Sequence, residues 1–148
     1  MKKVLIVCCL LLIATSLFAV ELKPYKYGYP SLFYMVDENK KPATLLGAPL
    51  KSGYISRVSS FILFNLDNAY NELVLTVGVS DDYITQLPSK INFYVDGVKV
   101  KTISVNAESM PEEITIPLNY KRQLKISTEY YSNNVYDAAV VLTNLDFR

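Results

Sequence analysis

Apolar residues recur at every second position along most of the chain after residue 30. The clearest set is Leu73, Leu75, Val77 and Val79. Because successive side chains of a β-strand point to opposite faces, this spacing places one side of each segment in a core. We find no long stretch with a convincing apolar repeat of about 3.6 residues, which a helix would need. The pattern therefore predicts an all-β fold.

Segments rich in turn residues separate the strands that we expect, which cover residues 31–36, 54–66, 73–79, 91–95, 98–105, 114–118, 124–126 and 139–145. Asp96-Gly97 is the only tight-hairpin signal, because both residue types tolerate the positive φ of a type I′ turn. The apolar phase changes in the strand that follows, which predicts a β-bulge near Lys101-Thr102. Seven or eight strands at this spacing imply a sandwich or a barrel formed by one domain.

Residues 1–19 have the pattern of a secretory signal peptide. Two lysines precede the apolar stretch 4–14, and Ala19 supplies a small residue for cleavage. The stretch is shorter than the roughly 20 residues that cross a bilayer, which favours cleavage over a retained anchor. Cys8 and Cys9 lie inside the apolar stretch rather than after it, so the lipoprotein pattern does not apply. We expect a secreted or periplasmic protein of the cell envelope, with no transmembrane span after cleavage.

Cleavage would leave a lead-in at residues 20–30, either mobile or added to a sheet edge, and a single β-sandwich domain at 31–148. It would also remove two of the 15 basic residues and none of the 14 acidic ones. The remaining net charge is close to zero, so we expect no basic surface for nucleic acid.

Both cysteines leave with the signal, and the chain has no histidine. Most hydrolytic sites need an imidazole, a thiolate or a metal held by such groups, so we expect no enzyme.

Acidic residues are the remaining candidates for chemistry. Asp81-Asp82 and Glu112-Glu113 could supply the two carboxylates of a glycoside hydrolase, but adjacent acids in a strand point to opposite faces. Turn caps and solvated charges are the simpler interpretation of both pairs. Loop oxygens from Asp81, Asp82 and Asp137 could instead hold a structural calcium ion, although their spacing matches no defined calcium loop.

Tyrosine is abundant, with 12 residues in a chain that has no tryptophan. Its flat ring and polar tip suit both the edge of a core and stacking on sugar rings. Tyr83 follows the acidic turn, and Tyr130 and Tyr131 precede Asn133 and Asn134 in an expected loop. We predict that these five residues bind ligand, with packing at the core edge as the alternative for each tyrosine. Three more would share one face of an extended lead-in: Tyr25, Tyr27 and Tyr29.

Several short motifs follow one another in a fixed order between Gly53 and Phe147. A strand at 60–66 is followed by Val-Gly-Val-Ser-Asp-Asp at 77–82 and by Phe-Tyr-Val-Asp-Gly-Val-Lys at 93–99. Two further strands and Tyr-Asp-Ala-Ala at 136–139 complete the series. Through these motifs, over about 95 residues, the chain resembles the NPCBM family of carbohydrate-binding modules. The family's histidine before the first core strand and its late tryptophan are missing, with Arg57 and Val141 near their places.

The resemblance implies an antiparallel β-sandwich of the jelly-roll, galactose-binding-like type with about eight strands. It also implies a secreted, non-catalytic domain that binds a polysaccharide or glycan through loops at one end of the sheets. The alternative function is a structural or adaptor protein of the cell envelope, which would dock on another protein through the sandwich or through residues 20–30.

Overall fold

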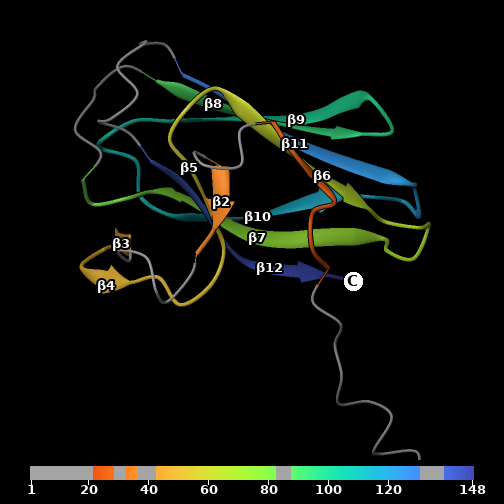
Figure 1. Cartoon of the computed structure of the whole chain (residues 1–148), viewed down its shortest axis with the longest axis horizontal. Coiled ribbons are helices and arrows are strands. Elements are labelled where there is room, and N and C mark those ends of the chain that lie inside the picture. Colours follow the sequence, from red (N-terminus) through yellow and green to blue (C-terminus); the bar gives the residue numbers. More distant parts are fainter. Residues whose placement is uncertain (1–21, 29–32, 37–42, 83–87, 131–138) are drawn as a thin grey trace, which may run out of the picture.

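Two five-stranded sheets stacked face to face form the body of the protein (Figure 1). The computed structural model describes residues 22–28, 33–36, 43–82, 88–130 and 139–148. Every strand pairing within these ranges is antiparallel. The same ranges contain no helix, and therefore no helix long and apolar enough to cross a membrane. The predicted all-β, antiparallel sandwich is therefore confirmed.

The first sheet has the strand order β1-β6-β11-β8-β9, and its members are β1 (Lys26–Tyr27), β6 (Ser60–Asn65), β11 (Gln123–Glu129), β8 (Ser89–Val95) and β9 (Val98–Val105). The second sheet has the order β10-β7-β12-β5-β2, and its members are β10 (Glu112–Pro117), β7 (Glu72–Val79), β12 (Val140–Phe147), β5 (Tyr54–Ser56) and β2 (Phe33–Met35). A separate hairpin pairs β3 (Thr44–Leu45) with β4 (Ala48–Pro49).

The longer strands, β6 to β12, coincide with the segments in which apolar alternation is strongest. About eight strands were expected, and the described residues contain 12. Three of the extra strands, β1, β3 and β4, have two residues each and are too short for alternation to show. The fourth arises because residues 54–66, expected as one strand, form β5 and β6, which belong to different sheets. One of the extra strands, β1, adds the lead-in to the edge of the first sheet beside β6, which is one of the two forms expected for that segment.

The inner faces of the two sheets pack around Phe64 of β6 and Phe93 of β8, which have no exposed surface. The rings of Phe64 and Tyr54 pack nearly perpendicular to each other with 5.9 Å between their centroids, and the centroids of Phe64 and Phe147 are 5.4 Å apart. The remaining inward positions are aliphatic, and those with no exposure include Ile62, Leu73, Leu75, Ile91, Ile116, Leu124, Ile126, Val140 and Leu142. Removing this apolar surface from water is the main stabilising contribution to the fold.

The Asp96-Gly97 turn joins β8 to β9 as predicted. Both residues have positive φ, 47° and 82°, as a type I′ turn requires. The predicted bulge is also present in β9, although one residue earlier than expected. Tyr94 pairs with Lys99 and Phe93 with Lys101, so Val100 is the extra residue.

A second tight turn was missed by the sequence analysis. Leu46 and Gly47 have φ of 53° and 74° between β3 and β4. Leucine rarely adopts positive φ, so the local sequence carries no hairpin signal there. The turn is held by tertiary contact, since Asp81 accepts a hydrogen bond from the Gly47 N–H at 2.9 Å and donates its own N–H to the Thr44 carbonyl at 2.9 Å.

Phe93→Ala tests the position of the core. The substitution should lower the free energy of unfolding by about 3–5 kcal/mol, because it removes a fully buried ring and leaves a cavity. Thr115→Ala on the exposed side of β10 is the control and should change it by less than about 0.5 kcal/mol. Urea unfolding of the two variants gives the comparison, and equal losses would contradict this assignment of the core.

Candidate functional site

At one end of the sandwich β7 and β11 finish and β12 begins, and we call this the loop end. Of the predicted ligand-binding residues, Tyr83, Tyr131, Asn133 and Asn134 lie outside the described residues, so their role stays a prediction. The structure does place Tyr130, which directly follows β11.

Tyr130 is half-buried and packs against the core. Its hydroxyl donates a hydrogen bond to the Ser56 carbonyl and accepts one from the Val140 N–H at 3.0 Å. These bonds join the end of β5 to the start of β12. For Tyr130 the structure therefore supports packing at the core edge, the alternative that the sequence left open, rather than an exposed stacking ring.

The acidic pair also bonds within the protein. Asp81 accepts a hydrogen bond from Gly47, and Asp82 accepts hydrogen bonds from Ser80 and from the Arg57 guanidinium at 3.2 Å. The hydrogen bond from the Thr44 side chain, followed by that from Gly47, holds the pKa of Asp81 below its usual value. Burial acts to raise the pKa of Asp82, but the hydrogen bond from Ser80 and the charge of Arg57 outweigh it and lower that pKa.

The calcium hypothesis named Asp81, Asp82 and Asp137. Within the described ranges, no group of three or more acidic, histidine or cysteine side chains is placed to hold a metal ion. Asp137 lies outside those ranges, and the two other aspartates take part in the turn and ion-pair contacts given above. Calcium binding stays a prediction.

Tyr130→Phe should lower the free energy of unfolding by about 1–2 kcal/mol, because it leaves the Ser56 carbonyl and the Val140 N–H without their partner. The matched control is Tyr120→Phe at a ring that is 60% exposed, and it should leave stability nearly unchanged. Chemical denaturation of both variants provides the measurement. Equal stability of the two would mean that the Tyr130 hydroxyl contributes nothing to joining β5 and β12.

Asp82 should contribute to the dependence of stability on pH. Its pKa is lower in the folded protein, so its contribution is complete above the unfolded value of about 3.9 and is lost as pH falls through the folded value. Asp82→Asn should therefore reduce the fall in thermal midpoint between pH 6 and pH 3. Asp67→Asn, at an exposed turn, is the control. If the thermal midpoint of Asp82→Asn fell between pH 6 and pH 3 as much as that of the wild type, Asp82 would make no contribution to the pH dependence of stability.

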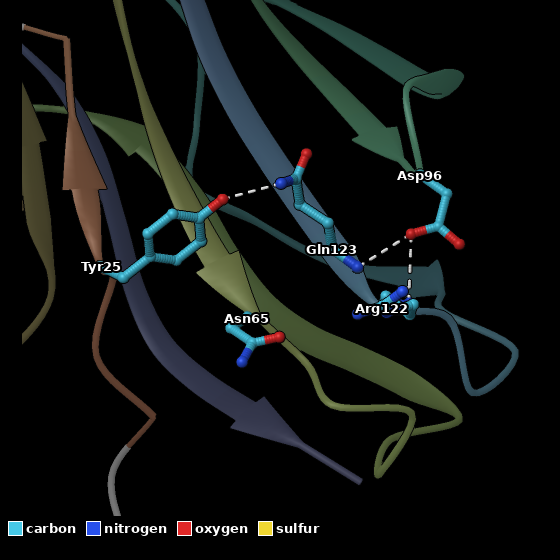
Figure 2. Close-up of a pocket in the computed structure, with 5 residues that line it drawn as sticks. All are labelled: Tyr25, Asn65, Asp96, Arg122 and Gln123. Atoms are coloured by element: carbon cyan, nitrogen blue, oxygen red, sulfur yellow. Dashed lines mark hydrogen bonds between the residues drawn. The ribbon is translucent and has the colours of Figure 1, made fainter.

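An open depression of about 470 Å³ lies at the opposite end of the sandwich (Figure 2). It is lined by Tyr25, Asn65, Asp96, Arg122 and Gln123. Tyr25 directly precedes β1, Asn65 ends β6, Asp96 belongs to the β8–β9 turn, and Arg122 and Gln123 lie just before and at the start of β11. The volume is within the range of about 300–1,000 Å³ that small-molecule sites occupy. We call it the Tyr25 depression.

The Asp96 carboxylate positions the start of β11. Its Oδ1 accepts hydrogen bonds from the backbone N–H groups of Arg122 at 3.1 Å and Gln123 at 2.9 Å. The Asp96 N–H donates in return to the Gln123 carbonyl at 3.0 Å. The predicted hairpin turn therefore also fixes the strand that carries the central amide of the depression (Figure 2).

The Tyr25 hydroxyl points toward this amide (Figure 2). Gln123 Nε2 donates a hydrogen bond to the Tyr25 hydroxyl at 2.7 Å, and the Tyr25 N–H donates to the Leu63 carbonyl at 2.9 Å. Hydrogen bonds thus hold both the backbone and the hydroxyl of Tyr25, yet 56% of the residue remains exposed. A ring fixed in this way loses little conformational entropy when a ligand binds.

The Tyr25 depression combines an exposed aromatic face with amide groups of Asn65 and Gln123 and the cation of Arg122. Such a set can stack on the apolar face of a sugar ring and exchange hydrogen bonds with its hydroxyls. An extended lead-in was expected to place Tyr25, Tyr27 and Tyr29 on one face, and Tyr29 lies outside the described residues. In the structure the chain bends at Tyr25, while Tyr27 packs against the core and burial raises its pKa.

Comparison with known proteins found no matching protein-family model and no match among curated proteins. Solved structures do match. A CBM51 module from a Clostridium perfringens GH95 protein, solved with methyl-galactose, superposes with a TM-score of 0.68 at 14% identity, over 86% of this chain and 96% of that one. The CBM51-2 and INT domains of Clostridium perfringens ZmpB give a TM-score of 0.67 at 16% identity, over 86% of this chain and 30% of that one.

The tandem CBM51 modules of Streptococcus pneumoniae Sp3GH98 give a TM-score of 0.60 at 12% identity, with 84% of this chain and 44% of that chain covered. At such identities the likeness establishes the fold alone, which is the β-sandwich of these three structures. The β-sandwich implied by the NPCBM resemblance is therefore confirmed, while membership of that family stays a prediction.

Proposed function

We propose that the chain is an exported, non-catalytic domain that binds a glycan in the Tyr25 depression. The observation that carries the proposal is the Tyr25 ring, which is exposed to solvent yet oriented by Gln123 beside further hydrogen-bonding groups. Sugars present both an apolar ring face and a rim of hydroxyls, so they suit a site that offers a fixed aromatic surface and planar amides together.

The fold supports the same class of ligand. One similar module was solved with methyl-galactose, and another structure of the ZmpB domains was solved with GlcNAc. The lack of histidine in the chain, and of cysteine after residue 9, argues against most hydrolytic mechanisms and favours binding without catalysis. Export follows from the signal-peptide pattern at residues 1–19.

The adaptor function has less support at the lead-in. Lys26 and Tyr27 already pair with Leu63 and Ile62 of β6, so this part of the segment is engaged in the protein's own sheet. Docking on a partner by strand addition would require this pairing to open, or would have to use another edge of the sandwich.

Tyr25→Ala tests the proposal directly. A glycan array with the purified domain identifies the tightest-binding oligosaccharide, and titration calorimetry then compares variants. Tyr25→Ala should cost on the order of 1–3 kcal/mol of binding free energy, because it removes the fixed ring. Tyr120→Ala is the matched control, since that tyrosine is 60% exposed on the neighbouring β10–β11 turn and does not line the depression.

Normal binding by Tyr25→Ala would contradict the proposed location. If a Tyr83→Ala and Tyr131→Ala double variant then lost binding, the ligand would instead be bound by the tyrosines that the sequence singled out. Absence of any glycan binding, with specific capture of an envelope protein, would assign the domain to the adaptor class instead.

A further inference from the structure

On the outer face of the first sheet, a row of paired residues runs across the five strands, and alternate strands contribute a lysine to it. Cross-strand pairing sets one residue from each strand side by side in the order Lys26, Leu63, Lys125, Tyr94 and Lys99. Adjacent strands are about 4.8 Å apart, so the Cα atoms of successive lysines lie about 10 Å apart. We call this set the lysine row.

The row faces solvent because its neighbours along each strand face the core. Phe64, Leu124 and Phe93, each one residue away from a member of the row, have no exposed surface. Since side chains alternate along a strand, the row must lie on the opposite face. Lys26 and Lys99 at the two edges are exposed, and Lys125 in the middle is half-buried.

Aromatic rings support the ammonium groups. Lys125 Nζ lies 5.0 Å from the centroid of the Phe61 ring and 5.4 Å from that of Tyr94, and Lys99 Nζ lies 5.4 Å from the Tyr94 ring. These cation–π contacts hold the lysine side chains along the sheet surface without neutralising their charge. Among the described residues, carboxylates pair with Arg57 and Arg148, and the row's lysines take part in no ion pair.

The row is continuous with the Tyr25 depression. Gln123 of the depression lies two residues before Lys125 on β11, and Asn65 lies two residues after Leu63 on β6, so these pairs share the outer face. Tyr25 directly precedes Lys26. A glycan seated on Tyr25 and extending across the sheet would therefore pass over the lysines.

We infer that the glycan bound by this domain is an acidic polysaccharide, whose carboxylate or sulfate groups are taken by the lysine row while one sugar occupies the Tyr25 depression. The inference rests on the proposed function. The domain as a whole has nearly balanced charge after signal cleavage, so the attraction is local to this face rather than general. A polymer with regularly spaced negative groups meets cations spaced regularly across the strands.

Two pairs of polymers separate charge from sugar recognition. Polygalacturonate is compared with its fully methyl-esterified form, which keeps the backbone and removes the carboxylates. Dextran sulfate is compared with dextran, which tests sulfate in the same way. The wild-type domain should bind the charged member of at least one pair more tightly, and this preference should shrink as salt is raised, because exposed charges are screened.

A Lys99→Gln and Lys125→Gln double variant should lose about tenfold in affinity for the preferred charged polymer at low salt, as two exposed ion pairs are lost. Its affinity for the uncharged partner should be unchanged. The control double variant, Lys51→Gln and Lys121→Gln, removes the same charge at exposed positions outside the row and should bind as the wild type does. Thermal unfolding of each variant confirms that all compared proteins are folded.

The outcomes distinguish this inference from the proposed function. Equal affinity for charged and uncharged polymers, or equal loss in the two double variants, overturns the lysine row as an acidic-glycan site. Glycan binding that still depends on Tyr25 would leave the proposed function standing in that case. Binding to anionic lipid vesicles or single-stranded DNA, with no binding to either charged polymer, would also overturn the inference and assign the row to another class of partner.

Discussion

Packing of the two inner sheet faces determines which residues of this domain face solvent. A slip of one residue in any long strand would turn its buried side chains outward, so the cost of exposing Leu124 and Ile126 keeps Gln123 and Lys125 on the outer face. The same reasoning applies to β8, where burial of Phe93 directs Tyr94 outward. The surface that we assign to glycan binding is therefore a direct consequence of the core behind it.

The two ends of the sandwich use their polar side chains differently. At the loop end, Asp82 and Tyr130 direct their hydrogen bonds to other parts of the chain and stabilise the connections there. At the opposite end, the side-chain hydrogen bonds described for Asp96 all come from backbone N–H groups at the start of β11. They position Gln123 so that its amide donates a hydrogen bond to the Tyr25 hydroxyl. That end combines local rigidity with exposed recognition groups, which is what a preformed binding site requires.

Alternation in the sequence was sufficient to predict the long strands, and Asp96-Gly97 was sufficient to predict its turn, because both signals are local. The Leu46-Gly47 turn could not be predicted in this way, since Asp81 holds it from 34 residues away. Tyr25 was visible as one of three spaced tyrosines, but its role depends on a bend in the chain and on a partner 98 residues distant. Tyr130 does follow the end of β11 as expected, but its packing role could not be decided from the sequence, because nothing there reveals the backbone groups that its hydroxyl meets.

Ligand binding at the Tyr25 end of the first sheet is tested most directly by titrating the isotopically labelled domain with its tightest-binding oligosaccharide and recording backbone amide NMR spectra. We predict that the largest changes in chemical shift fall on Asn65, Asp96, Arg122 and Gln123 and extend along β11 toward Lys125. Shifts confined to the loop end, around Arg57, Asp82 and Tyr130, with the Tyr25 depression unchanged, would contradict it.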